Sequence, residues 1–156
     1  MHFDMKNIIR TYKRGFQLIE LMVTLGVIAI LAVISIPVLT QYQPNLKLNA
    51  NAKELINNLR LTQQMTISEQ KTYYLEINTI SNEYYIIKAE IPNPPIKTIK
   101  LNEEINFKEI IDLTGDKVIF NSYGAVSEAG QIILTNSEND VININIKPSG
   151  YVQMEK

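Results

Sequence analysis

The sequence predicts an α+β protein in which one long N-terminal helix precedes an antiparallel β-sheet or β-sandwich head. Three observations carry this prediction. Between Gly15 and Leu46 the only charged residue is Glu20, so the apolar residues gather in one stretch. A stripe of apolar residues at helical spacing follows that stretch. After residue 70 the pattern changes to short β-branched and aromatic runs separated by turn residues.

Composition narrows the classes of function. A chain of 156 residues has room for one compact domain and one appended segment, and its net charge of −1 gives no overall basic footprint for nucleic acid. There is no cysteine, and the one histidine is His2. Zinc sites and the usual nucleophile–base pairs need those residue types. We therefore expect no metal, no cofactor and no enzyme active site.

The N-terminal 15 residues are basic and lead directly into the apolar stretch. They contain four basic side chains and one acidic side chain, Asp4. A basic flank keeps its side of a membrane segment in the cytoplasm. Phe16 to Leu39 would form a helix of about 36 Å, which is long enough to cross the hydrocarbon core. The basic residues are Lys6, Arg10, Lys13 and Arg14.

Three interpretations compete for this segment. It could be a plain membrane anchor, or a conventional signal peptide, whose apolar region would be about 7–15 residues long and end in small residues. Val33-Ile34-Ser35 fits such a cleavage site poorly, and Glu20 would lie inside the apolar region. A carboxylate at membrane depth costs about 2.5–3.5 kcal/mol on insertion scales. Glu20 therefore either snorkels to the headgroups or finds an amine within an assembly, which is the third interpretation.

The segment Lys13-Arg14-Gly15-Phe16-Gln17-Leu18-Ile19-Glu20-Leu21 resembles the class III signal of type IV prepilins and type II secretion pseudopilins. The resemblance implies that a prepilin peptidase cuts after Gly15 and N-methylates Phe16. It also implies that Glu20 pairs with the Phe16 amine of a neighbouring subunit. Breaking a buried pair by removing one partner costs about 3–5 kcal/mol, so such a pair would fix subunit register.

The same resemblance divides the chain. Residues 1–15 would be a cleaved leader, residues 16–39 a transmembrane and assembly helix, and residues 40–156 a periplasmic head. The protein would cross the bacterial inner membrane once, with its N-terminus in the cytoplasm, and later enter a pilus or pseudopilus. Its expected partners are other pilins or pseudopilins, the prepilin peptidase, the inner-membrane assembly platform and the lipid bilayer.

Two prolines, Pro37 and Pro44, follow the apolar stretch, and a kink or local melting of the helix is expected there. Residues 45–70 then predict an amphipathic helix that packs on the head. Its apolar stripe is expected to be core, and its polar face to be exposed. The stripe comprises Leu48, Ala52, Leu55, Ile56 and Leu59, and the polar face comprises Lys53, Glu54, Asn57, Asn58 and Arg60.

Residues 72–154 are expected to form strands. Thr79–Asn82 predicts a hairpin connection, and adjacent tyrosines in a strand should place one ring in the core and one outside. Such an exposed tyrosine could serve a protein interface, but ordinary strand packing is the favoured interpretation. The predicted strands are Thr72–Asn78, Glu83–Ala89, Lys97–Leu101, Lys117–Asn121, Gln131–Thr135, Val141–Ile146 and Tyr151–Met154, and the tyrosine pairs are Tyr73-Tyr74 and Tyr84-Tyr85.

The C-terminal half resembles the GspH/FimT-type head. That group shows a Phe-x-x-x-Gly motif, a glycine-led apolar strand and a terminal strand–turn–glycine–strand. The matching residues are Phe120 to Gly124, Gly130 to Leu134, Ile144 to Ile146 and Ser149 to Val152. An unrelated β-sandwich behind a pilin-like anchor is the alternative. The resemblance implies a minor pilin or pseudopilin that initiates or caps a type II secretion pseudopilus or a type IV pilus.

DNA binding is one alternative function. Some FimT-type minor pilins bind DNA, but the C-terminal region from Gly150 to Lys156 has no arginine. Loss of residues 1–15 removes four basic side chains and one acidic one, which moves the net charge from −1 to about −4. Phosphate contacts need lysine or arginine, so nucleic acid is disfavoured as a partner.

An anchored enzyme is the other alternative. The acid pairs Glu103-Glu104 and Glu138 with Asp140 could in principle flank a cleft, as in glycoside hydrolysis. They lie in polar segments that are typical of solvated loops, so no activity is predicted. A membrane-anchored β-domain without a filament role completes the set of alternatives.

Overall fold

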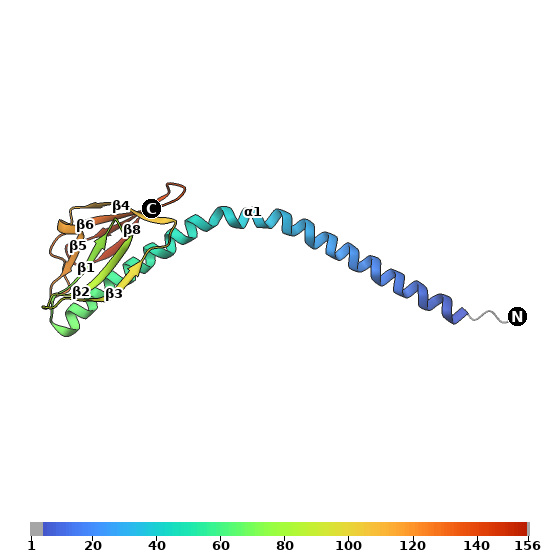
Figure 1. Cartoon of the computed structure of the whole chain (residues 1–156), viewed down its shortest axis with the longest axis horizontal. Helices are drawn as coiled ribbons and strands as arrows, with labels where there is room; N and C mark the ends of the chain where they lie inside the picture. Colours follow the sequence, from blue (N-terminus) through green and yellow to red (C-terminus); the bar gives the residue numbers. More distant parts are fainter. Residues whose placement is uncertain (1–4, 156) are drawn as a thin grey trace. The chain divides into compact units, whose positions relative to one another are not determined.

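The structure is a computed structural model that describes residues 5–155, with side chains described for residues 17–35 and 42–155. The chain forms two compact units, of which the first ends at Tyr42 and the second begins at Gln43. The second unit is the head, and Figure 1 labels α1 and most of the strands.

One helix, α1, runs from Met5 to Glu69. The helix assignment continues through Pro37 and Pro44, so local melting at the prolines, one of the two outcomes expected there, is wrong. Each proline lacks one amide donor, and the loss of single hydrogen bonds leaves the neighbouring i to i−4 bonds in place. The amphipathic segment predicted for residues 45–70 is therefore the C-terminal part of this helix.

Eight strands follow α1 and form two four-stranded sheets. The first sheet has the order β3-β2-β1-β5 and the second β4-β6-β7-β8, with antiparallel neighbours throughout. A short 3₁₀ helix, η1, spans Thr114–Asp116 before β5. The strands are β1 Tyr73–Asn78, β2 Glu83–Lys88, β3 Pro95–Lys100, β4 Ile105–Ile111, β5 Lys117–Phe120, β6 Gly130–Asn136, β7 Val141–Ile146 and β8 Val152–Glu155.

The α+β class and the strand-rich head are confirmed. Seven strands coincide with the predicted ones to within about two residues at each end, and β1 and β2 form the predicted hairpin around residues 79–82. Strand β4 was missed. A register shift between Phe107 and Glu109 breaks its inward–outward alternation, so Lys108 and Glu109 interrupt the pattern of apolar residues.

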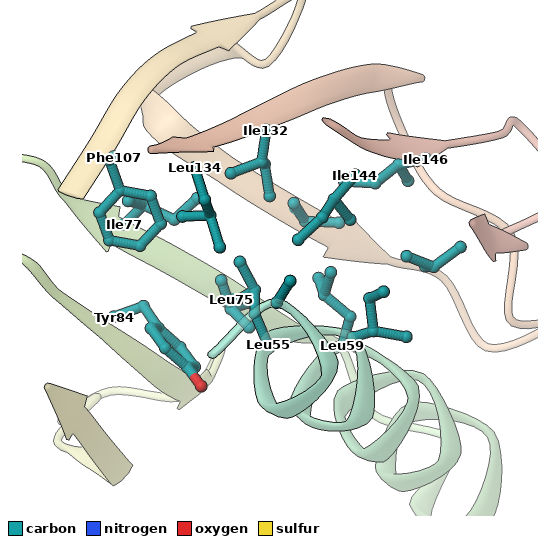
Figure 2. Close-up of a cluster of buried hydrophobic side chains, with 14 of the residues drawn as sticks. Leu55, Leu59, Leu75, Ile77, Tyr84, Phe107, Ile132, Leu134, Ile144 and Ile146 are labelled. Carbon is teal, nitrogen blue, oxygen red and sulfur yellow. The ribbon is translucent and has the colours of Figure 1, made fainter. Parts of the chain in front are cut away.

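The core of the head lies between the two sheets and α1 (Figure 2). Leu55 and Leu59 come from the helix, Leu75 and Ile77 from the first sheet, and Ile132, Leu134, Ile144 and Ile146 from the second. All five residues of the predicted helical stripe are buried, which confirms its role. Because the buried apolar residues of the described part of the chain lie between Leu48 and Val152, the head has a core of its own.

The tyrosine prediction is confirmed for the core member of each pair, whereas the other member is half-buried and not fully exposed. Tyr73 is 1% exposed and Tyr84 is fully buried, whereas Tyr74 and Tyr85 are half-buried. Tyr84 reaches α1 from β2, and its hydroxyl accepts a hydrogen bond of 2.8 Å from Nδ2 of Asn58. The two residues thus tie the helix to the first sheet.

Asn58 corrects the prediction for the polar face of the helix. It was expected to be exposed, but it is only 4% exposed. Its Nδ2 also donates to the carbonyl oxygen of Glu54 at 3.0 Å, and its Oδ1 accepts from Nζ of Lys97 at 2.9 Å. A buried amide is tolerated because these partners satisfy it. Helical periodicity shows none of them, since Tyr84 and Lys97 lie on other elements.

Tyr84 should make the head sensitive to alkali. Burial raises the pKa of the Tyr84 hydroxyl, although the hydrogen bond from Asn58 lowers it. An unfolded tyrosine titrates at about pH 10. Tyr84 therefore contributes stability that is complete below about pH 10 and is lost as the pH rises toward the higher folded-state pKa. We expect Tyr84→Phe to cost about 1 kcal/mol at neutral pH and to flatten the loss of stability above about pH 10.

Urea unfolding of the head between about pH 7 and pH 11 measures this effect. Burial also raises the pKa of Tyr73, so wild-type and Tyr84→Phe heads must be compared at each pH. Tyr123→Phe is the control, because the Tyr123 side chain is 92% exposed. Parallel curves for the wild-type and Tyr84→Phe heads would contradict the assignment.

Candidate functional site

The N-terminal part of α1 carries a continuous apolar surface. Gln17–Ser35 is long and apolar enough to cross a membrane, and none of this segment is buried within the protein. Its polar hydroxyls are satisfied locally, since Thr24 donates to the carbonyl oxygen of Leu21 at 2.8 Å and Ser35 to that of Leu31 at 2.7 Å. Such bonds allow hydroxyls to lie in an apolar environment. The segment suits a lipid bilayer or a bundle of apolar helices.

Glu20 is the one acidic residue of this segment, and it is exposed. Among the described residues it has no ion-pair partner and its carboxylate accepts no hydrogen bond. A carboxylate on an apolar helix needs a partner when the helix leaves water. Residues 17–35 therefore carry one carboxylate, without a partner among the described residues, on a surface that otherwise suits lipid.

The remaining predicted site residues lie one turn and more before Glu20. Lys13, Arg14, Gly15 and Phe16 belong to the helical backbone of α1, and their side chains lie outside the described part of the chain. Gly15 precedes Glu20 by five positions, and Phe16 by four. Their predicted roles in cleavage and methylation stay predictions.

The acid pairs of the head have structural contacts. Glu104 forms an ion pair of 2.7 Å with Lys47, and Glu103 is exposed beside it. Asp140 accepts from Nδ2 of Asn136 at 3.0 Å in the β6–β7 turn, where Glu138 is exposed. Within residues 17–35 and 42–155, no group of three or more acidic residues or histidines could hold a metal ion.

A charged cluster joins the C-terminal end of α1 to β2. Glu69 accepts from the Tyr73 hydroxyl at 2.6 Å and from Nζ of Lys88 at 3.2 Å. The hydrogen bond from Tyr73, and then that from Lys88, holds the pKa of Glu69 below its usual range. The hydrogen bond to Glu69 raises the pKa of Lys88. Exposed ion pairs of this kind contribute little individually, so the cluster orients the helix end and offers no reactive group.

Two turns meet against α1 near Gln63. Gly150, in the β7–β8 turn, lies against the carbonyl oxygen of Gly124, in the turn that follows β5. The Gln63 side chain donates from Nε2 to that same carbonyl oxygen at 2.6 Å. Gly150 has a φ of 80°. The Gly124 and Gly150 positions of the predicted head motifs thus build one helix–turn–turn junction.

A groove runs beside this junction between α1 and β8. One hollow of about 300 Å³ is lined by helix residues and by β8, and a second of about 490 Å³ continues it to the β7–β8 turn. Both hollows share Arg60, Tyr151 and Val152, so they form one surface, which we call the α1–β8 groove. The sequence does not reveal it, because the contact between α1 and β8 joins segments about 90 residues apart in the chain. Its other residues are Lys53, Ile56, Asn57, Gln63, Ser149, Gly150, Gln153 and Met154.

Comparison with known proteins adds two findings. Residues 10–36 match the family model described as the prokaryotic N-terminal methylation motif. That range includes Gly15, Phe16 and Glu20. A search of curated proteins found no match.

The structure resembles solved pilin-like proteins. It superposes on the minor pseudopilin EpsH from the type 2 secretion system of Vibrio cholerae with a TM-score of 0.61 at 9% identity, covering 70% of this chain and 96% of that one. It also superposes on the type IV minor pilin FimU of Pseudomonas aeruginosa with a TM-score of 0.59 at 11% identity, covering 74% and 92%. At such identities the likeness shows the fold, and it confirms the resemblance to this type of head.

Proposed function

We propose that this chain, with a prokaryotic N-terminal methylation motif at one end and a minor-pilin type of head at the other, is a minor pilin or pseudopilin. The observation that carries the proposal is the presence of both features in one chain, joined by the apolar part of α1. Each alone is less specific, because anchors and β-rich heads occur in many proteins. The chain would initiate or cap a type II secretion pseudopilus or a type IV pilus.

The charge pattern supports an orientation in the bacterial inner membrane. The four basic side chains before residue 16 favour a cytoplasmic N-terminus, and the apolar segment Gln17–Ser35 crosses the bilayer once. The head then lies in the periplasm. This orientation leaves the leader within reach of a prepilin peptidase, which would cut between Gly15 and Phe16 and methylate Phe16.

The exposure of Glu20 supports a role in assembly. Methylation keeps the new α-amine of Phe16 cationic, and a neighbouring subunit's Phe16 amine is a suitable partner for the Glu20 carboxylate in an apolar helix bundle. The acid pairs that could flank a cleft have structural contacts or exposed positions, since Glu104 pairs with Lys47 and Asp140 accepts from Asn136. We therefore propose a structural subunit without enzymatic activity, which assembles with other pilins through the inner-membrane platform.

Replacement of Glu20 by glutamine should abolish this assembly. Breaking a buried charge pair costs about 3–5 kcal/mol, which corresponds to a loss of at least about a hundredfold in the association constant. The variant is expressed in a strain whose own copy of the gene is deleted. The measurement is the fraction of the total protein that is recovered in sheared pili or pseudopili. Total membrane-bound chain and leader removal should stay unchanged.

Glu103→Gln is the matched control, because it makes the same chemical change at an exposed loop of the head. It should assemble as the wild type does. Assembly of Glu20→Gln at the wild-type level would contradict the proposed charge pair. Failure of the wild-type chain to enter any filament would contradict the function itself.

A further inference from the structure

The α1–β8 groove carries basic groups on an acidic head. The head, residues 43–156, has eleven basic and fourteen acidic side chains, for a formal charge of −3. Lys53 and Arg60 line the groove and lie seven residues apart on α1. Seven residues make nearly two helical turns, so both side chains lie on one side of the helix, about 10 Å apart along its axis. A third cation, Lys147, lies 5.5 Å from the centre of the Tyr151 ring at the same end as Arg60.

These three cations differ from the ion-paired lysines of the head, although Lys97, Lys100 and Lys108 also lack an ion-pair partner among the described residues. Four of the described lysines take part in ion pairs with glutamates, but Lys53, Arg60 and Lys147 have no ion-pair partner among residues 17–35 and 42–155. Glu54, the acid next to Lys53 in sequence, contributes to the electrostatic environment of Tyr84, on the first-sheet side of the helix. The paired lysines are Lys47, Lys71, Lys88 and Lys117.

The groove also offers apolar and aromatic surface. Ile56, Val152 and the half-buried Met154 lie along it, and the Tyr151 ring at its rim is 55% exposed. Tyrosine and arginine are enriched where protein interfaces derive most of their energy. The contact of Gly150 with Gly124 and the hydrogen bond from Gln63 hold this rim in place, so little ordering is needed on binding.

We infer that the α1–β8 groove docks an acidic segment of a neighbouring pilin-like subunit, with two carboxylates about 10 Å apart facing Lys53 and Arg60. This inference rests on the proposed function, and it names the partner's chemistry. Nucleic acid fits less well, because a duplex would also approach the acidic remainder of the head and needs more cations for its phosphates. An acidic protein segment combines the carboxylates with apolar side chains that match the floor of the groove.

The test is co-purification of full-length chains from membranes. The chain is co-expressed in turn with each of the other proteins of its genome that carry a prepilin-type N-terminal motif, and the complex is isolated in detergent. One partner should co-purify with the wild-type chain. The double variant Lys53→Glu/Arg60→Glu should retain about a tenth of that partner or less, and raised salt should weaken the wild-type complex in the same direction.

Lys108→Glu is the matched control, since Lys108 is exposed on β4, at the opposite edge of the same sheet from β8. It should retain the partner. Equal retention by the double variant and the wild type, equal losses in the double variant and the control, or no partner for the wild-type chain would each overturn the inference.

A duplex DNA of about 30 base pairs at low salt tests the competing ligand. A shift by the wild-type chain that the double variant lacks would also overturn the inference, in favour of a nucleic-acid groove. The proposed function has separate readouts. If the leader of the wild-type chain is removed and its assembly depends on Glu20, the proposed function stands even when the groove binds no subunit. If the wild-type chain shows neither leader removal nor assembly, the proposed function is contradicted.

Discussion

Gly150→Ala is expected to destabilise the head by about 3 kcal/mol. Two costs combine at this position. A φ of 80° is unfavourable for any residue with a Cβ, by about 1–2 kcal/mol. The new methyl group would also overlap the carbonyl oxygen of Gly124 and lie 2.5 Å from Nε2 of Gln63. Relief of this overlap requires the turn to move, at the expense of the Gln63 hydrogen bond, whose loss costs about 0.5–1.5 kcal/mol.

Gly115→Ala separates the two costs. Gly115 has a φ of 65°, but a Cβ there would meet only Cε of Lys117, at 4.0 Å. We expect this variant to lose about 1 kcal/mol, which is the backbone cost alone. Urea unfolding of the two heads beside the wild-type head measures both values. Equal losses for the two variants would contradict the packed junction of helix and turns.

Gly15→Leu is expected to abolish removal of the leader. Under the proposed function the peptidase must bring the backbone of residue 15 close to its catalytic groups, and a branched side chain at that position obstructs the approach. The uncleaved chain would stay in the membrane, because the segment Gln17–Ser35 is unchanged. It would also lack the Phe16 amine and therefore the proposed partner of Glu20.

Gly26→Leu makes the same substitution in the apolar segment. A Cβ at Gly26 meets nothing within 4 Å, so the substitution is accommodated within the chain. Its leader should be removed at the wild-type rate, as judged by electrophoresis of pulse-labelled membranes. If the leader of Gly15→Leu were removed at that rate, the proposed processing site after Gly15 would be wrong.

Local patterns predicted much of the fold. The helical stripe from Leu48 to Leu59 and the alternation of Ile142, Ile144 and Ile146 are local, and the structure buries all of these residues. Strand β4 escaped prediction because a bulge after Phe107 shifts its alternation, and the position of a bulge depends on the pairing partner β6. The burial of Asn58 escaped for a similar reason, since its partner Tyr84 is 26 residues away.

The candidate functional residues likewise include a local motif, which the sequence predicts, and a groove built from distant segments, which it does not. The motif around Gly15, Phe16 and Glu20 is contiguous, so sequence alone suggests it, and the matched family model spans it. The α1–β8 groove joins residues 53–63 with residues 149–154, and no local pattern brings those segments together. The proximity of Tyr151 and Arg60 depends on how the second sheet packs against α1, which is a tertiary contact.

The intact mass of the chain extracted from membranes, with and without prepilin peptidase, tests the central proposal most directly. We predict that the enzyme-containing strain yields a chain shortened by residues 1–15 and heavier by one methyl group, with Phe16 as its first residue. The strain without the enzyme should yield the full-length chain. A full-length, unmethylated mass in both strains would contradict the proposal and leave an anchored β-rich head.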